Sequence, residues 1–411
     1  MQVDVGIVGA GLSGLACARE CARRGLSYAV FERAERVGGR VVSDVQDGFV
    51  LDRGFQVLLS AYPEVQAQID LDALEPGRFA PGGLVRRGGD FWRVVDPWRS
   101  PMQGLLTLRA PFITLSDGLR MAQLRDEAIA GRHEGDSRTT DAFLREFGFT
   151  DGLIEGFLRP FFGGVTLDRS LSSPAWYFTR LFGWFARGDA TLPAKGMQAL
   201  PEALAGALDA SALYLGEAVA SVEPGAIVLA SGTRVDCGRV VVATEAHVAA
   251  DLLGIERSRE WNGTTTLYYA ADESPVGEPI LVVNGEGPDD GPVNHLCVLS
   301  DAQPAYAPEG RALVSVSVLG VPEAPDPELN EDVRHQLEGW YGGAVNGWQL
   351  LRVDRLRHAL PKFGTGEPLT ANEGGVLVCG DHLATPSIQG SMESGRLAGE
   401  AAASALGAAS D

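Results

Sequence analysis

Residues 3–40 read VDVGIVGAGLSGLACARECARRGLSYAVFERAERVGGR, and this stretch decides the fold. An apolar, strand-like run leads into a glycine-rich turn, and a helix is expected over about residues 12–24. Gly25 stands where the residue that closes a helix commonly belongs. The next run, LSYAVFE, is typical of a second strand. The pattern therefore predicts a βαβ unit.

The turn carries a phosphate-binding spacing, G-x-G-x-x-G, at Gly9, Gly11 and Gly14. The first glycine permits the turn, the second lets a pyrophosphate approach the backbone, and the third allows the helix to pack closely on the strand. Leu12 and Ser13 begin the helix, where unpaired N–H groups can bind phosphate oxygens. These residues predict a dinucleotide site.

An acidic residue at the end of the second strand strengthens this prediction. Glu32 follows Gly9 by 23 residues, and a carboxylate there can accept hydrogen bonds from both ribose hydroxyls. An acid at this place also disfavours a 2′-phosphate. An ordinary βα turn would account for the glycines but not for Glu32, and Arg33 beside it is assigned to the same site.

A second glycine pair separates FAD from NAD. Gly38, Gly39 and Arg40 follow Glu32 in an E-x(5)-G-G-R arrangement, which resembles the signature of the amine oxidase superfamily of FAD-dependent oxidoreductases. That superfamily includes monoamine and polyamine oxidases, protoporphyrinogen oxidase and phytoene desaturases. Paired glycines allow close backbone approach to a diphosphate, and a guanidinium offers it a bidentate cation.

The resemblance extends to the stretch LDRGFQVLL, residues 51–59. It implies that Gly54, Phe55 and Gln56 lie along the flavin. It also implies that the strand containing Val219 passes over the adenine. No cysteine occupies a convincing covalent-flavin position, so the cofactor is expected to be noncovalent FAD.

The closing segment VLVCGDHLATPSIQGSMESGRLAGEAAA, residues 376–403, is similar to the family's last strand, G-D turn and helix. By that resemblance Gly380 and Asp381 bind the ribityl or phosphate oxygens. The backbone of Ile388 and Gln389 then begins a helix directed at the N1–C2=O edge of the flavin, where the helix dipole would stabilise the reduced anion.

The chain is too long, at 411 residues, for one ordinary core. A mostly helical, irregular stretch is expected over about residues 61–196. Residues 261–354 contain strand-like runs such as HLCVLS and ALVSVSVL and an amphipathic helix candidate at residues 328–342. This alternation favours interleaved domains. We expect an α/β, Rossmann-like FAD-binding domain of the GR2 type and an α+β substrate domain. The FAD domain is assigned to residues 1–60, 197–260 and 355–411, and the substrate domain to residues 61–196 and 261–354.

The substrate prediction rests on departures from the amine-oxidising branch. The position that commonly holds an aromatic ring before the last helix matches Ser387, and residues 261–354 contain no lysine. Lys195 matches a structural joint between the domains. The aromatic segment 157–185 resembles the desaturase and protoporphyrinogen oxidase branch, with a packed core as the alternative.

We therefore predict hydride transfer from a C–H bond of a hydrophobic substrate to flavin N5, desaturase-like or protoporphyrinogen-oxidase-like. A flavin amine oxidase is the nearest alternative. A non-redox flavin-dependent isomerase and an inactive FAD-binding protein are alternatives from other classes. No catalytic residue is assigned, and His382 is only a candidate neighbour of the flavin.

Composition limits the partners. The net charge of −20 disfavours nucleic acid, and five cysteines without metal-type spacing indicate no metal site and a reduced, cytoplasmic protein. The first strand leaves no room for a signal peptide, and no apolar run is long enough to span a bilayer. The segment 102–124 is a candidate for transient membrane-surface contact, with a buried helix pair as the alternative. The oligomeric state is not predicted.

Overall fold

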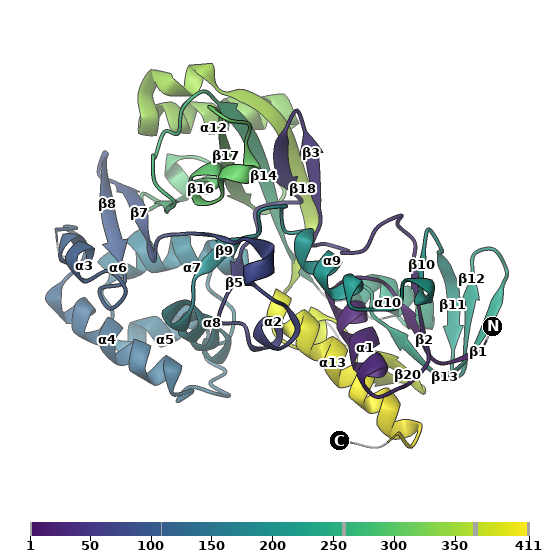
Figure 1. The fold of residues 1–411 in the computed structure, drawn as a ribbon. Helices are drawn as coiled ribbons and strands as arrows, with labels where there is room; N and C mark the ends of the chain where they lie inside the picture. The colour runs from purple at the N-terminus through teal and green to yellow at the C-terminus, as the bar shows by residue number, and fades with distance from the viewer. Residues whose placement is uncertain (1, 108, 257–259, 365–368, 409–411) are drawn as a thin grey trace.

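The computed structural model describes residues 2–107, 109–256, 260–364 and 369–408. Within these ranges, the two largest sheets have eight and seven strands, and Figure 1 shows a group of helices beside the second of them. The chain passes back and forth between these parts, so that its first and last segments lie together in one of them. All five cysteines are unpaired and buried.

The first sheet is built on the predicted βαβ unit, with strand order β10-β2-β1-β13-β12-β11 and β20 beside β13. β1 pairs in parallel with β2 and with β13. The predicted helix ends at Arg23, one residue earlier than expected. The elements are β1 (Gln2–Val8), α1 (Leu12–Arg23), β2 (Tyr28–Glu32), β10 (Leu213–Leu215), β11 (Val219–Glu223), β12 (Ala226–Leu229), β13 (Arg234–Val242), α10 (Ala246–Leu253), β19 (Asn372–Glu373), β20 (Val376–Val378) and α13 (Ile388–Ala405). This arrangement confirms the predicted Rossmann-like α/β class.

Two close contacts hold the turn of this unit in place. A Cβ on Gly14 would lie 1.9 Å from the carbonyl oxygen of Gly9, so only glycine lets α1 approach the turn. A Cβ on Gly395 in α13 would lie 2.0 Å from the carbonyl oxygen of Ser13. The N-terminus of α1 is therefore fixed between its own strand and the last helix.

The second sheet has the order β18-β14-β17-β16-β15-β7-β8. Its strands are β7 (Gly82–Arg87), β8 (Asp90–Val95), β14 (Trp261–Ala271), β15 (Leu281–Asn284), β16 (Val293–Val298), β17 (Ala312–Leu319) and β18 (Gln349–Pro361). The predicted amphipathic helix is α12 (Asp326–Tyr341), and its Leu329, Val333 and Leu337 share a core with these strands.

The segment expected to be mostly helical also contributes a hairpin to this sheet. β7 and β8 are joined by Gly88 and Gly89, both with positive φ. A two-residue Gly-Gly connection is a strong hairpin signal, and the expectation of a mainly helical segment missed it. β18 also runs across the predicted domain limit at residues 354 and 355, so one strand extends from this sheet toward the first.

Helices from residues 101–187 pack around a phenylalanine-rich core. They are α3 (Pro101–Thr107), α4 (Leu115–Ile129), α5 (Thr140–Phe147), α6 (Asp151–Leu153), a π-helical turn η2 (Ile154–Leu158), α7 (Arg159–Thr166) and α8 (Ala175–Arg187). Short elements complete the chain between the larger parts: β3 (Ser43–Gln46), β4 (Phe49–Asp52), β5 (Leu58–Leu59), α2 (Pro63–Gln68), β6 (Gly77–Arg78), β9 (Ala190–Leu192), α9 (Ala199–Gly206) and α11 (Leu299–Ala302). None of the described helices is long and apolar enough to cross a membrane.

Candidate functional site

A cavity of about 890 Å³ extends from the glycine turn of the first sheet to side chains of the second sheet and the helices. Of the 18 residues that the sequence assigns to FAD, 16 line it: Gly9, Gly11, Leu12, Ser13, Glu32, Arg33, Gly38, Gly39, Arg40, Gly54, Phe55, Gln56, Val219, Gly380, Asp381 and Ile388. They come together from seven separate stretches of the chain. That these residues bind FAD stays a prediction.

The two glycine motifs lie against each other at one end of the cavity. The N–H of Gly38 donates to the carbonyl of Ala10 at 2.9 Å, and Gly11 and Gly38 form an isolated parallel bridge. A Cβ on Gly39 would lie 3.4 Å from the Cα of Gly11. The wall here is bare backbone, which a diphosphate can approach closely.

The N-terminus of α1 faces this wall with open donors. The first helical hydrogen bond runs from the N–H of Leu15 to the carbonyl of Gly11 at 3.0 Å, and no side chain caps the N-terminus of the helix. The N–H groups of the first turn, at Leu12, Ser13 and Gly14, lie outside the helical ladder. Since these groups carry partial positive charge, the arrangement is suited to an anion.

Glu32 is held in place for a ligand by the backbone. Its two carboxylate oxygens accept from the N–H groups of Ala10 and Ala34, each at 2.9 Å. Each carboxylate oxygen can accept more than one hydrogen bond, so the group retains acceptor capacity toward the cavity. This geometry suits the predicted recognition of ribose hydroxyls.

Arg40 and Asp381 contact each other across the cavity wall. The Nη2 of Arg40 lies 2.6 Å from Asp381 Oδ1, while its Nη1 donates to the carbonyl of Ala359 at 2.8 Å. Glu245 lies 3.6 Å from the Nε of Arg40. The predicted contact of this guanidinium with a diphosphate would therefore have to coexist with, or replace, part of this network.

The loop of residues 54–56 is anchored by side chains of the second sheet. Gly54 donates its N–H to Asp354 and Phe55 to Thr266, at 3.2 and 3.3 Å. The amide of Gln56 donates to the carbonyl of Arg40 at 3.1 Å. The loop thus connects the glycine motif that ends at Arg40 with the second sheet, along one side of the cavity.

Two assigned residues do not line the cavity, Gly14 and Gln389. Gly14 has the packing role that its place in the motif predicts. The side chain of Gln389 is turned away, and its Oε1 accepts from the N–H of Glu64 at 2.8 Å. Any contact of Gln389 with a cofactor would have to come through the backbone, as the resemblance implied. Ser387 caps α13 by accepting from the N–H of Gly390 at 3.0 Å.

The aromatic segment divides between core and cavity. Most of its rings pack together, as Phe162 and Phe178 do with ring centroids 4.7 Å apart. Phe161, Tyr177 and Phe185 line the cavity. Both interpretations of the segment therefore apply, each to different rings.

The lysine and the histidine that the sequence analysis considered as candidates, Lys195 and His382, do not line the cavity. Lys195 is exposed, and neither lysine is among the described residues that line the cavity. His382 is buried but does not line it.

A histidine that the sequence reasoning did not single out lies at the apolar end. His295 in β16 is buried, lines the cavity and contacts Phe55 with ring centroids 5.4 Å apart. Burial lowers the pKa of His295 to about 4, so the imidazole is neutral near pH 7. In the sequence, the available signal for His295 was its place in a strand-like run, directly before the apolar residues LCV. The residues around its side chain come from distant segments, so the sequence did not indicate a site.

Hydrogen bonds define which nitrogen of His295 carries the proton. Arg169 donates to Asn294 Oδ1 at 3.1 Å, which orients the amide. Asn294 Nδ2 then lies 3.0 Å from His295 Nδ1 and donates to it, so the ring proton belongs on Nε2. Nε2 has no hydrogen-bond partner in the part of the chain that the structure describes. It is a buried donor in the wall of the cavity.

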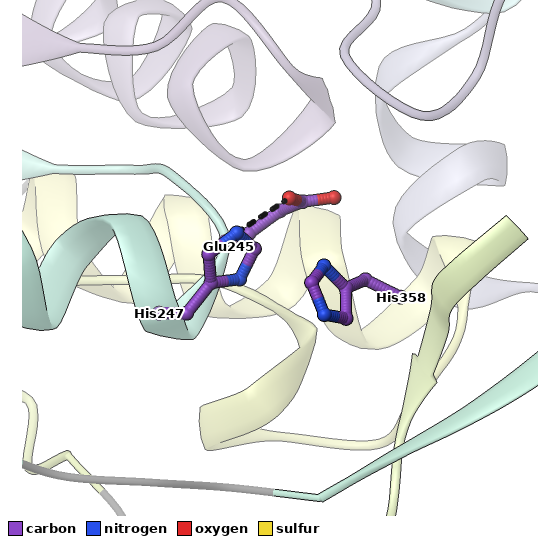
Figure 2. A group of neighbouring side chains, drawn as sticks. All are labelled: Glu245, His247 and His358. Atoms are coloured by element: carbon purple, nitrogen blue, oxygen red, sulfur yellow. Dashed lines mark ion pairs between the residues drawn. The ribbon is translucent and has the colours of Figure 1, made fainter.

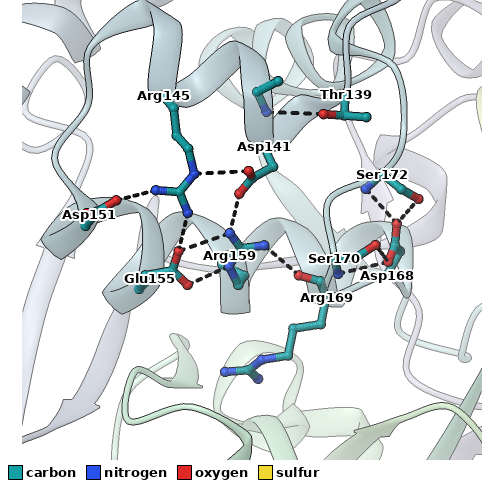
Figure 3. A network of polar contacts seen from close by, with 11 residues as sticks. Thr139, Asp141, Arg145, Asp151, Glu155, Arg159, Asp168, Arg169, Ser170 and Ser172 are labelled. Carbon is teal, nitrogen blue, oxygen red and sulfur yellow. Dashed lines mark hydrogen bonds and ion pairs between the residues drawn. The ribbon is translucent and has the colours of Figure 1, made fainter.

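The support for Arg169 is an ion-pair network on the helices (Figure 3). Arg159 pairs with Glu155 at 2.6 Å and donates to the carbonyl of Arg169 at 2.9 Å. Asp168 accepts from the backbone N–H groups of Ser170 and Ser172. Figure 3 shows the side chain of Arg169 extending away from this network. Its Nη1 is the atom that donates to Asn294.

The model of the family "Flavin containing amine oxidoreductase" matches residues 12–406. The chain belongs to this family. As a flavin-containing amine oxidoreductase it is an oxidoreductase of a flavoprotein family, which agrees with the resemblance drawn from its glycine motifs.

Curated relatives of this family member include several porphyrinogen oxidases. Protoporphyrinogen oxidase 2 of Arabidopsis thaliana is 31% identical over 168 residues, 39% of this chain and 32% of the relative. Coproporphyrinogen III oxidase of Propionibacterium freudenreichii is 31% identical over 170 residues, 39% of this chain and 31% of the relative. The chain thus matches about a third of the length of these relatives.

Solved structures match over nearly the whole chain. Putrescine oxidase bound to putrescine has a TM-score of 0.71 and 17% identity, covering 99% of both chains. A structure described as a protoporphyrinogen oxidase of Exiguobacterium sp. has a TM-score of 0.73 and 18% identity, covering 98% of this chain and 99% of that one. At these identities the likeness concerns the fold.

Proposed function

We propose that this protein binds FAD noncovalently and oxidises a C–H bond of a hydrophobic substrate. The observation that carries the proposal is the single cavity, which joins a bare-backbone anion site at one end to aromatic walls at the other. A ligand with a diphosphate and a planar apolar ring system fits this sequence of surfaces. A second, apolar ligand can approach from the aromatic end.

The residues divide into cofactor-holding groups by their chemistry. The N-terminus of α1 and Gly38–Gly39 would bind the diphosphate, and Glu32 would bind the ribose. Phe55, the Gly380–Asp381 turn and the start of α13 at Ile388 would hold the flavin half. Val219 lies on the cavity wall formed by the first sheet, where the adenine is expected.

A flavin held by these residues would supply the redox chemistry, as the acceptor of hydride from the substrate. The chain itself excludes water with Phe161, Tyr177 and Phe185 and orients the substrate. The neutral His295 offers an Nε2–H donor to an acceptor atom of the substrate or cofactor. No residue is assigned as a general base.

Two features favour a desaturase-like or protoporphyrinogen-oxidase-like reaction over amine oxidation. Ser387 stands where an aromatic ring is expected in the amine-oxidising branch, and it is used to cap α13. The cavity has no lysine among its described lining residues. The names of the curated relatives, protoporphyrinogen and coproporphyrinogen III oxidases, support the same preference.

The experiment begins with the visible spectrum of the purified protein before and after denaturation. Flavin bands that appear in the released fraction would support noncovalent FAD. A colourless protein that takes up no added FAD would overturn the proposal. Anaerobic titration with porphyrinogens, polyenes and amines then identifies the substrate class by bleaching of the flavin.

The same titration separates the alternatives from other classes. An isomerase would convert its substrate only after prior reduction and would consume no oxygen. An inactive FAD-binding protein would bleach with none of the candidates. Bleaching by amines alone would favour the amine oxidase.

A further inference from the structure

Three side chains with metal-binding atoms meet beside the cavity. Glu245, His247 and His358 each place one ligand atom so that all three lie within 4.8 Å of one another (Figure 2). The imidazoles of His247 and His358 have ring centroids 4.4 Å apart. Glu245 and His358 also line the cavity.

The three groups are brought together from two distant segments. Glu245 is the N-cap residue of α10 and His247 lies in the first turn of that helix. His358 belongs to β18, more than 100 residues later. The sequence therefore shows no metal-type spacing, and the prediction of no metal site did not consider this group.

The carboxylate of Glu245 is only loosely held by its neighbours. Its oxygens lie 3.6 Å from Arg40 Nε and 3.6 Å from His247 Nε2, both beyond ordinary hydrogen-bond length. The Nδ1 of His247 has no hydrogen-bond partner among the described residues. Within the described ranges, the group thus has lone pairs that take part in no ordinary hydrogen bond.

We propose that Glu245, His247 and His358 bind one divalent transition-metal ion, with Zn²⁺ as the best fit. Two imidazole nitrogens and one carboxylate oxygen are a ligand set that zinc accepts. Tetrahedral zinc with bonds of about 2.0–2.2 Å holds its ligand atoms about 3.3 Å apart. The ligand atoms now lie within 4.8 Å of one another, so they must approach more closely around an ion, and the exposed side chain of His358 has room to move.

Three protein ligands leave a fourth coordination position for water or another oxygen ligand. Because two of the three ligands line the cavity, the ion would lie at the edge of the proposed FAD site. The ion would also tie the start of α10 to β18, and so join the first sheet to the strand that extends from the second. The site does not depend on FAD being present.

The test uses full-length protein without a histidine tag. Apoprotein and FAD-loaded protein are dialysed against Zn²⁺, and bound zinc is measured by atomic emission and the affinity by calorimetry. We expect one zinc per chain and at least tenfold weaker binding in His247→Ala and His358→Ala. His335→Ala, which removes an exposed histidine of α12, should bind zinc like the wild type.

A Co²⁺-loaded sample provides a second measurement, because its visible absorption reports the coordination of the ion. The proposal is overturned if the wild type binds no stoichiometric zinc, or if the double variant His247→Ala/His358→Ala retains it. Circular dichroism of the variants shows whether they are folded. Since the apoprotein is measured as well, a failure of FAD binding would leave this result interpretable.

Discussion

Glu32 is the single residue whose replacement should most affect cofactor retention. Its carboxylate is fixed by the N–H groups of Ala10 and Ala34. Glu32→Arg would remove the carboxylate oxygens that accept hydrogen bonds and place a cation where the ribose hydroxyls need an acceptor. We therefore expect at least a tenfold loss of FAD per purified chain. Glu35→Arg makes the same charge change at an exposed residue just after the end of β2 and is the control. Equal FAD content in both variants would refute the assignment.

His295 should make the stability of the protein depend on pH in a defined direction. Its pKa is about 4 in the fold, because of burial, and about 6.5 in an unfolded chain. The unfolded state therefore binds a proton first, and the folded state loses stability as the pH falls through 6.5 toward 4. Between pH 7 and pH 5 this single group contributes a loss of about 2 kcal/mol.

The comparison that isolates this effect is urea unfolding of wild type and His295→Gln at both pH values. The variant lacks the titrating group, so its free energy of unfolding should fall by about 2 kcal/mol less than that of the wild type. Parallel losses in the two proteins would show that His295 is not a neutral buried imidazole.

The cavity residues that could be predicted from the sequence are those whose proposed chemistry imposes a local spacing. Gly9, Gly11 and Glu32 lie within one βαβ unit, so their distances along the chain are set by the strand and helix between them. His295 could not be found in this way, because Arg169 and Asn294, which fix its proton, lie far apart in the sequence. His247 and His358 were missed for the same reason.

At the level of elements, the contact between α1 and α13 depends on small residues. A Cβ at Gly395 would meet the backbone of Ser13 at 2.0 Å, which flexible side chains cannot relieve. We expect Gly395→Ala to destabilise the protein by about 1–3 kcal/mol and to weaken FAD binding by shifting the first turn of α1.

Gly339→Ala is the matched control for this change. Gly339 lies inside α12 and a Cβ there would meet nothing within 4 Å, so alanine should stabilise the helix by about 0.5–1 kcal/mol. Thermal unfolding and FAD content are measured for both variants. A Gly395→Ala protein as stable as the control would show that the two helices can separate without cost.

The elements that could be predicted are those with their own periodic pattern, such as α12 and the strands β16 and β17. The hairpin of β7 and β8 was missed because arginines and glycines surround its apolar residues. Its pairing partner in the sheet is β15, about 200 residues later, and this contact rather than the local pattern establishes the strand. Tertiary pairing therefore decided an element that local propensity left open.

For the whole molecule, β18 shows why a domain limit drawn at one residue, between 354 and 355, does not separate two parts of this chain. The strand pairs with β14 along the second sheet, and its residues 355–360 line the cavity together with the glycine motifs of the first. The loop of residues 54–56 makes the reverse connection. The cavity forms only where the part built on the first sheet packs against the second sheet. The predicted domains therefore describe two packing units, and not two pieces that could be separated.

The outer surface of the helices carries exposed apolar side chains that could contact a membrane. In the segment suspected from sequence, Leu124 is buried, while Met102, Leu115 and Leu119 have exposed fractions of 89%, 74% and 76%. Leu108 lies outside the described residues. Exposed apolar side chains of this size on one segment favour shallow insertion at a lipid interface.

The net charge of −20 decides which lipid surface this segment would prefer. Anionic vesicles repel the molecule as a whole, whereas zwitterionic vesicles leave the apolar contact unopposed, and added salt should reduce the difference between them. We therefore expect co-sedimentation with phosphatidylcholine vesicles and weaker binding when phosphatidylserine is included. The triple variant Met102→Gln/Leu115→Gln/Leu119→Gln should lose this binding and keep its FAD content. If wild type and triple variant sediment alike, the exposed residues have another use, and the hydrophobic substrate reaches the cavity without a lipid surface.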